Sequence, residues 1–440
     1  MRLRFRWIRP AILLTVTIGV AATLVACSAV LGFDALTLHP HDGGPETQAD
    51  GPITIGDGAP MGDAGEDGPT TCVADLTGDP KNCGRCNHAC LGGTCQSSRC
   101  QPLKLADGLA IPEGLAVSGA DVFVTEFDLN RIVRFGKNAL GPCTSAPLPS
   151  QCVFTEDQAN VFKPTAMGID ATDIYWANAG SGNFHEIRSC PQAGCGGQAA
   201  KLIANLGRDA FGHLFGSGVL PLDLVVKDGL VFWPESNGGA IRSAPVGGGT
   251  VTTYLDSSNF MPLAIAVDGT SVFFTDDTNQ HATRIQAVPR DGSARDGGAV
   301  KVIASTPARP HGIGLTTTGN LYWTIPFIVQ PGDGLVQASS KTADGGAPIG
   351  AVATGQIDPG ALMVDAANVY WLVAGAANAA TGMVLYCPLS GCPNDGPIIL
   401  AKEQRFPRHI TQDESAIYWS NEGLSSAVTY DGQVWKTAKP

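Results

Sequence analysis

Basic residues are scarce in this sequence of 440 residues. Lys and Arg total 28 against 40 Asp and Glu, and charged residues of both signs make up only 15% of the chain. Such a chain does not attract nucleic acid or an anionic membrane surface by charge, so we expect no nucleic-acid partner. The GxSxG, HExxH and P-loop motifs are absent, which removes three common signatures of enzymes. Glycine is abundant instead, with 55 residues, as in turn-rich β proteins.

The first 26 residues contain no acidic residue. Four arginines precede an apolar run over residues 11–25; they are Arg2, Arg4, Arg6 and Arg9. This order is typical of an export signal, and the run is short for a membrane-spanning helix. Without residues 1–26, 24 basic residues would remain against 40 acidic ones, a net charge of −16.

The segment LVAC, residues 24–27, resembles the lipobox of bacterial lipoproteins. The resemblance implies a lipoprotein signal peptide over residues 1–26 and lipid attachment at Cys27, with Ser28 permitting sorting to the outer membrane. We therefore expect an exported protein that contacts the membrane through a lipid anchor. Its location would be the periplasmic face or the cell surface. The alternatives are an ordinary signal peptide cut nearby or an uncleaved anchor.

Residues 27–71 are acidic and rich in Gly and Pro. Seven carboxylates in residues 38–71 meet no Lys or Arg, and the stretch lacks the acid spacing of an EF-hand calcium loop. Such a composition cannot bury enough apolar surface to offset its ordering entropy, so we expect a disordered tether.

Twelve cysteines remain beside Cys27, an even number that indicates a disulfide framework in an exported chain. Residues 72–100 hold six of them, at Cys72, Cys83, Cys86, Cys90, Cys95 and Cys100. The others form three local couples, Cys143 with Cys152, Cys190 with Cys195, and Cys387 with Cys392. The CxxC spacing of Cys83 and Cys86 also permits zinc binding or a redox dithiol, but export favours disulfides. Residues 72–100 resemble small Stig1-like cysteine modules, which implies no activity.

A phrase with a proline, a short apolar run, a polar turn and an aromatic pair occurs seven times. The copies span residues 111–126, 163–178, 220–235, 261–276, 309–325, 358–373 and 406–421, and six of them keep the same proline-to-aromatic spacing. Two apolar runs joined by Asp-, Gly- or Asn-rich turns predict a β-hairpin. In 174–176, Ile174 and Trp176 share one face and Tyr175 takes the other, so both faces need cover from a neighbouring sheet.

A third strand follows each hairpin, and a fourth follows most of them. Seven four-stranded units predict an all-β, seven-bladed β-propeller over residues 101–440; six blades are the alternative, because the first copy is weak. The last copy lacks a fourth strand, which residues 101–107 would supply, closing the ring. Residues 111–436 resemble YWTD and NHL propellers, of which the YWTD members have six blades. That resemblance implies the fold and no particular activity.

The residues after each proline are expected near the central channel. They are Glu113, Thr165, Leu222, Leu263, His311, Gly360, Arg408 and the adjacent His409. Residues after the aromatic pair are expected at one rim, namely Glu126, Asn178, Glu235, Asp276 and Asn421. Catalytic candidates are Glu113, His311, Arg408 and His409, as base, acid and anion clamp. A loose resemblance to lactonase-type propellers suggests a divalent metal at Glu113, Asn178 and Asp276; otherwise no cofactor is expected.

Two functions follow from this pattern. The favoured one is a binding or scaffolding platform for an envelope protein, a polysaccharide or another extracellular ligand. The long loops 207–219, 324–334 and 372–382, with Phe211, Phe215 and Phe327, would make contact. The alternative is a propeller hydrolase, lactonase or lyase with a polar site in the channel.

Overall fold

The computed structural model describes residues 75–138, 152–156, 160–179, 185–196, 198–206, 221–277, 283–297, 300–330, 332–346, 348, 350–376, 378–424 and 430–440. All of these residues belong to one compact unit, Thr70–Pro440. The predicted signal peptide, Cys27, the tether and Cys72 lie outside the described residues. In the part that is described, no helix has the length and apolar character needed to span a membrane.

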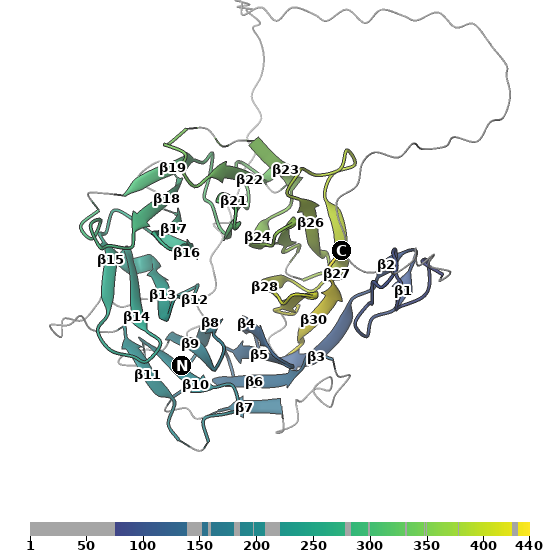
Figure 1. The fold of residues 1–440 in the computed structure, drawn as a ribbon, viewed down its shortest axis with the longest axis horizontal. Helices are drawn as coiled ribbons and strands as arrows, with labels where there is room; N and C mark the ends of the chain where they lie inside the picture. The colour runs from purple at the N-terminus through teal and green to yellow at the C-terminus, as the bar shows by residue number, and fades with distance from the viewer. Residues whose placement is uncertain are drawn as a thin grey trace, which may run out of the picture. The chain divides into compact units, whose positions relative to one another are not determined.

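Seven four-stranded antiparallel sheets surround a central axis in the described part of the chain (Figure 1). The predicted seven-bladed propeller is confirmed, and the six-bladed alternative is wrong. The weak first copy forms a complete blade because Val122, Phe123 and Val124 are as buried as their counterparts.

Each blade is a meander of four consecutive strands except the last. Blade 1 contains β4 (Pro112–Ser118), β5 (Asp121–Glu126), β6 (Arg131–Gly136) and β7 (Val153–Thr155); blade 2 contains β8 (Pro164–Ile169), β9 (Asp173–Ala179), β10 (His185–Pro191) and β11 (Lys201–Asn205). Blade 3 contains β12 (Val225–Lys227), β13 (Leu230–Glu235), the 3-10 helix η3 (Ser236–Gly238), β14 (Ala240–Pro245) and β15 (Thr252–Asp256); blade 4 contains β16 (Pro262–Val267), β17 (Ser271–Asp276), β18 (Arg284–Pro289) and β19 (Lys301–Ser305). Blade 5 contains β20 (Ile313–Leu315), β21 (Asn320–Ile325), β22 (Gly334–Ser340) and β23 (Gly350–Gln356); blade 6 contains β24 (Pro359–Val364), β25 (Asn368–Val373), β26 (Gly382–Pro388) and β27 (Ile398–Gln404).

Blade 7 closes the ring with a strand from the beginning of the propeller. It contains β28 (Pro407–Gln412), β29 (Ala416–Asn421), β30 (Gly432–Ala438) and β3 (Leu103–Leu109). Leu103 lies opposite Lys436 and Ala106 lies opposite Val434, while Leu105 sits at a bulge and is 1% exposed. The predicted closure is therefore confirmed, because β3 pairs with β30 as the fourth strand of blade 7.

The aromatic pair packs neighbouring blades together, as predicted. Tyr175 of blade 2 shares a buried cluster with Trp233 of blade 3, whereas Trp176 shares one with Phe123 of blade 1. At the other five interfaces, the first residue of the aromatic pair in one blade again packs with the second residue of the pair in the next blade. These contacts are Phe232 with Phe274, Phe273 with Trp323, Tyr322 with Trp371, Tyr370 with Trp419, and Tyr418 with Val124, which takes the place of an aromatic residue in blade 1. Because aromatic side chains bury large apolar areas, these seven clusters constitute the main hydrophobic core.

An aspartate organises the turn between the first two strands in several blades. In blade 7, the Asp413 carboxylate accepts hydrogen bonds from the N–H groups of Ser415 and Ala416, both at 2.8 Å, and from the Tyr418 hydroxyl at 2.9 Å. Asp170 and Asp365 make the same bonds, and Asp268 makes those to the backbone. This arrangement was not predicted from the sequence, although an aspartate at a turn is its typical signal.

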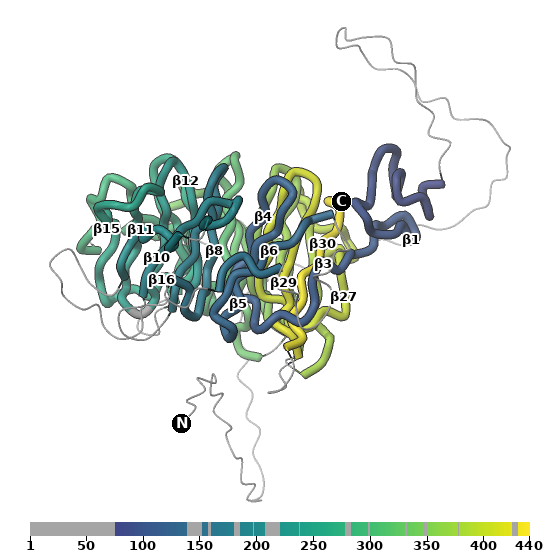
Figure 2. The backbone as a smooth tube through the Cα atoms, turned by 90° about the horizontal axis from the view of Figure 1, so that it is seen from below, coloured from purple at the N-terminus to yellow at the C-terminus, as the bar shows by residue number. Residues whose placement is uncertain are grey.

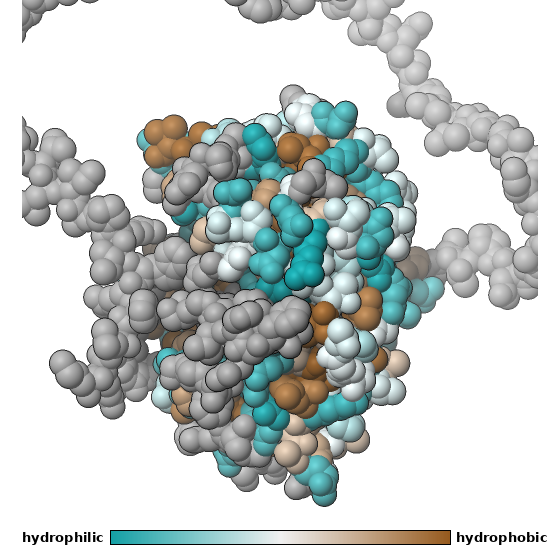
Figure 3. Space-filling view, turned by 90° about the vertical axis from the view of Figure 1, so that its left-hand side faces the viewer, coloured by the Kyte–Doolittle hydropathy of each residue, from teal (hydrophilic) through white to brown (hydrophobic). Residues whose placement is uncertain are grey.

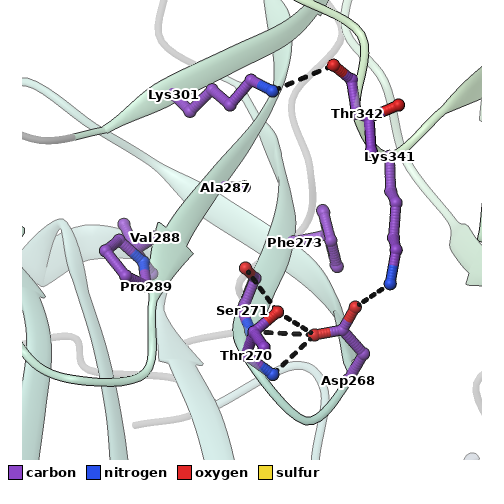
Figure 4. A pocket seen from close by; sticks show the side chains of 10 residues that line it. All are labelled: Asp268, Thr270, Ser271, Phe273, Ala287, Val288, Pro289, Lys301, Lys341 and Thr342. Atoms are coloured by element: carbon purple, nitrogen blue, oxygen red, sulfur yellow. Dashed lines mark hydrogen bonds and ion pairs between the residues drawn. The ribbon is translucent and has the colours of Figure 1, made fainter.

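The same aspartates connect neighbouring blades. Lys137, which follows β6 of blade 1, lies 2.8 Å from Asp413 of blade 7, and Lys341 of blade 5 lies 2.7 Å from Asp268 of blade 4. The further pairs are Lys439 with Asp365 and Arg290 with Asp228. Figure 4 shows Asp268 and Lys341 beside a cleft of about 300 Å³ between blades 4 and 5, so its charged lining is already engaged in holding the two blades.

Disulfides follow the predicted framework where both cysteines are described. Cys83 bonds Cys95 and Cys90 bonds Cys100 around the short strands β1 (Cys95–Gln96) and β2 (Arg99–Cys100). The local couples Cys190–Cys195 and Cys387–Cys392 are also bonded. Cys152 is disulfide-bonded as well, whereas Cys143 lies outside the described residues. Since Cys83 bonds Cys95, the redox dithiol of Cys83 and Cys86 is wrong.

The cysteine-rich segment packs onto the closing blade. The His88 ring lies between two carbonyl oxygens, 2.6 Å from that of Cys83 and 2.8 Å from that of Lys439, and Leu91 packs against the core between blades 7 and 1. Figure 2 shows this segment beside the C-terminal end of β30. The segment therefore covers the joint at which the ring closes.

Candidate functional site

The meander gives the propeller two distinct faces. Turns between strands 1 and 2 and between strands 3 and 4 lie on one face, which we call the turn face. The segments that lead into strand 1 and those between strands 2 and 3 lie on the other, which we call the loop face. The proline of each repeated phrase begins its blade at the loop face, so the residues after it surround the channel mouth there.

A break in strand register follows the proline in five blades. It lies between Pro112 and Gly114 in blade 1 and between Pro407 and His409 in blade 7, with further breaks after Pro164, Pro262 and Pro359. A bulge re-aims the side chain at that point. Side-chain exposure agrees with a position at the mouth: 22% for Glu113, 40% for Arg408 and 30% for His409.

The remaining residues after the prolines differ in exposure. His311 is exposed, Leu222 is 44% exposed, and Leu263 and Gly360 are partly exposed. Thr165 is instead buried, and its hydroxyl donates to the Pro221 carbonyl of the next blade at 2.9 Å. The prediction that this position faces the channel therefore fails at Thr165, where the hydroxyl serves the contact between blades.

Blades 7 and 1 bring four ionisable side chains together at the channel mouth. Arg408 lies 3.8 Å from Glu113 and 3.2 Å from Glu422, measured from guanidinium nitrogen to carboxylate oxygen. His409 Nε2 lies 3.7 Å from the second oxygen of Glu113. We call Glu113, Arg408, His409 and Glu422 the mouth cluster.

The two carboxylates of the mouth cluster differ in acidity. The surrounding protein raises the pKa of Glu113, but the contact with His409 and the charge of Arg408 more than offset this and leave the pKa below its usual value. Burial raises the pKa of Glu422, whereas the positive charge of Arg408 lowers it. The negative charge of Glu113 raises the pKa of Glu422 further, so its net shift is upward. One carboxylate is thus a weaker acid than the other although both contact the same arginine.

Two further groups approach the cluster across the channel. His311 has an exposed side chain, yet the protein around the channel mouth, followed by the positive charges of Arg408 and His409, lowers its pKa to about 4, so this imidazole is neutral at pH 7. Asp223 accepts hydrogen bonds from the N–H groups of Leu224 and Ile265, both at 2.8 Å. Burial raises the pKa of Asp223, and the two N–H groups and the charge of His409 oppose the shift.

Of the catalytic candidates predicted from the sequence, Glu113, Arg408 and His409 lie within contact distance. His311 interacts with them electrostatically. Asp223 and Glu422 were missed. Asp223 stands two residues after its proline, as His409 does, and this shared offset is the signal that could have identified it.

The five residues expected at the rim are buried instead. Glu126, Asn178, Glu235, Asp276 and Asn421 are each at most 2% exposed. Three of these side chains accept hydrogen bonds from the backbone of the segment that leads into their own blade. Glu126 accepts from the N–H group of Ala110, Asn178 from that of Phe162 and Asp276 from that of Met261. The rim prediction is wrong because these positions are buried at the end of strand 2, where all but Glu235 lie opposite the proline that begins strand 1.

The structure gives no support to a metal held by Glu113, Asn178 and Asp276, since the last two bind backbone groups. Among the described residues, the one group of three or more candidate ligand side chains with suitably close donor atoms is Cys83, Cys90 and Cys100. Their sulfurs form disulfides, which also argues against the zinc alternative for this segment.

The candidate contact loops are partly described. Phe211 and Phe215 lie outside the described residues, whereas Phe327 is 51% exposed. On the side of the propeller that Figure 3 shows, the coloured surface is a mosaic of polar residues with separate hydrophobic groups.

Solved structures with this fold include proteins of very different kinds. Virginiamycin B lyase from Staphylococcus aureus is 18% identical, with 77% of this chain and 99% of that chain covered and a TM-score of 0.52. The WD40 β-propeller domain of Doa1 is 11% identical, with 76% and 95% covered and a TM-score of 0.51. No family model and no curated protein matches the sequence. At these identities the likeness shows the fold alone, and this chain is similar to both proteins as a β-propeller.

Proposed function

We propose that this protein is an exported, lipid-anchored propeller that serves as a binding platform at the cell envelope. The arginine-led apolar segment and the lipobox-like LVAC support export and lipid attachment at Cys27. The disulfides of the described part support an oxidising compartment. Its partner would be an envelope protein or a polysaccharide, bound on the loop face at the outer membrane.

The mouth cluster is the observation that carries this proposal. Its side chains keep 22–40% of their exposure, and their ionic contacts join them to one another and not to the core between blades. A guanidinium, two carboxylates and an imidazole offer several donors and acceptors to hydroxyl or amide groups of a ligand. Leu222, exposed on the blade 3 side of the channel, adds an apolar contact. Such a mixture of one apolar wall and a few convergent polar groups is typical of binding sites.

The test uses a soluble form of residues 70–440, which contains every described strand. We expect it to bind soluble envelope polysaccharide fragments in calorimetry, and we expect Arg408→Gln and Glu113→Gln to weaken binding at least tenfold. Matched controls are Arg295→Gln and Glu403→Gln, which change exposed charges away from the channel. Equal binding by all four variants would place the ligand elsewhere. A protein partner would appear as a crosslink at the loop face with no polysaccharide binding.

Acid–base catalysis at the same cluster is a second candidate. The observation that favours it is the opposite direction of the pKa shifts of Glu113 and Glu422, which suits a base and an acid. The fold is also that of virginiamycin B lyase, so lyase, lactonase and hydrolase substrates form the assay panel. Turnover that disappears in both Glu113→Gln and Glu422→Gln would support catalysis over binding alone.

A further inference from the structure

The loop between β21 and β22 of blade 5 exposes three consecutive large apolar side chains. Phe327 is 51% exposed, Ile328 37% and Val329 85%. Single exposed apolar residues are common on soluble proteins, but a consecutive group at the tip of a loop marks an interaction site. We call these three residues the apolar tip; it lies on the loop face, because it connects the second and third strands of its blade.

The apolar tip is held in place by an aspartate. The Asp333 carboxylate accepts hydrogen bonds from the N–H groups of Ile328, Val329 and Gln330, at 2.7, 2.8 and 3.0 Å. These bonds outweigh a small effect of burial and lower the pKa of Asp333, so the carboxylate is charged at neutral pH. With both oxygens bound to backbone N–H groups, the loop is organised with its side chains directed away from the core.

The base of the loop is fixed to the next blade. A side chain at Gly334 would come within 2.5 Å of the Pro326 carbonyl, 2.7 Å of the Gln356 carbonyl and 2.7 Å of Pro359, so the backbones of blades 5 and 6 are in close contact here. The residue after Gln356 is Ile357, which is 51% exposed. The connection between blades 5 and 6 thus contributes a fourth apolar side chain near the base of the apolar tip.

The chemistry of this surface favours lipid over protein. Residues 322–330 contain no charged side chain, and the acid that follows them in the sequence, Asp333, is engaged with the backbone. A stable protein interface buries roughly 800 Å² on each partner and has a polar rim, which four apolar side chains do not provide. A bilayer requires no matching shape, and apolar side chains can enter its headgroup–acyl boundary without basic residues.

We propose that the apolar tip inserts into a lipid bilayer and orients the loop face relative to the membrane. The 47 residues between Cys27 and Asp75 can span on the order of 160 Å when extended, so a lipid anchor at Cys27 would not prevent this contact. Insertion does not depend on that anchor, and it does not depend on the ligand of the mouth cluster.

Vesicle flotation tests the proposal on the soluble form of residues 70–440. We expect binding to neutral phosphatidylcholine vesicles, little changed by salt, and at least a tenfold loss in the triple variant Phe327→Ser, Ile328→Ser and Val329→Ser. The matched control carries Leu202→Ser and Ile399→Ser, which remove two apolar side chains that are 46% and 43% exposed on outer strands, and it should float like the unmodified protein.

Three results would overturn the proposal. One is the absence of flotation at millimolar lipid, and another is binding that requires anionic lipid and is lost in salt. The third is unchanged flotation of the triple variant; if that variant had instead lost self-association in sedimentation, the apolar tip would be a contact between two copies. None of these results affects the calorimetric test of Arg408 and Glu113, so failure of this inference is distinguishable from failure of the proposed function.

Discussion

The Asp413→Asn substitution tests how the ring is held at its closing interface. Asp413 belongs to blade 7, and its carboxylate lies 2.8 Å from the ammonium nitrogen of Lys137 in blade 1. The same carboxylate accepts from two backbone N–H groups and from the Tyr418 hydroxyl. An asparagine would remove the negative charge and replace one acceptor oxygen by a donor, so it would weaken both the turn and the bridge to blade 1.

The expected loss is moderate. A hydrogen bond to a charged group contributes about 1.5–3 kcal/mol, but the side chains of Lys137 and Asp413 keep 22% and 17% of their exposure, so solvent screens part of the attraction. We expect a decrease of about 2 kcal/mol in the free energy of unfolding at pH 7, or roughly 2–3 °C in Tm for a folded part of this size.

The effect has a defined pH dependence. Burial raises the pKa of Asp413, but the bonds from Lys137, Ser415, Tyr418 and Ala416 outweigh it and hold the pKa well below 3.8. Because the folded state binds this proton more weakly than the unfolded state, the stabilisation is fully present above about pH 4 and declines as the pH falls toward the folded-state pKa. Thermal unfolding of both proteins should show a constant difference from pH 5 to 8 and a smaller one at pH 3.

Asp170 supplies a natural control in the same fold. It makes the same turn bonds, to Thr172 N–H, Asp173 N–H and the Tyr175 hydroxyl. In blade 3, the position that corresponds to Lys137 is occupied by the uncharged Val246. Asp170→Asn therefore removes the turn bonds but no ion pair between blades. If Asp170→Asn and Asp413→Asn cost the same at pH 7, or if Asp413→Asn costs nothing, the reasoning about an ion pair between blades is refuted.

Four further substitutions test aromatic packing, two buried hydroxyls and the cysteine-rich segment. Trp371→Ala removes a fully buried indole whose N–H donates to Gln356, and it should cost about 3–5 kcal/mol in urea unfolding. Thr324→Val should lower the free energy of unfolding by about 1–3 kcal/mol, because the Gly312 N–H group and the Gly360 carbonyl lose their hydrogen-bond partner. In contrast, Ser420→Ala should be neutral within about 0.5 kcal/mol, since that buried hydroxyl has no hydrogen-bond partner among the described residues. His88→Ala should speed amide exchange at the C-terminal end of β30, and unchanged exchange would show that the segment does not secure the closing blade.

The sequence predicted the architecture because the same physical requirement recurs in each blade. Both faces of the aromatic strand must be covered, so the pair with Tyr175 and Trp176 implied stacked sheets, and the missing fourth strand of the last copy implied closure by residues near Leu103. These deductions need only alternation along a strand and the cost of an open sheet edge, which are local properties of the sequence.

The mouth cluster could be predicted only in part, because its geometry arises between blades that are distant in sequence. The offset after the proline identified Glu113 and Arg408, but their contact depends on blade 7 meeting blade 1. Glu422 was missed because it follows the second strand, at a position where the repeated phrase has no common residue type. Conversely, Asn178 and Asp276 were expected at a rim because they are polar, whereas backbone N–H groups at the base of the blade require an acceptor there.

The seven blades act as an internal comparison that separates structural from functional positions. Where a position meets the same requirement in every blade, similar residues recur: the aromatics at the interfaces and the aspartates at the turn face are examples. The position after the proline meets no common packing requirement, and it holds glutamate, threonine, leucine, histidine, glycine and arginine in different blades. An ionic group exposed at such a position is not needed to hold the ring, since Leu222 and Gly360 occupy it in other blades without loss of the fold. The mouth cluster therefore occupies positions at which the fold does not require a particular side chain. For this reason we expect the ligand to bind there and not at the interfaces between blades, where similar residues recur.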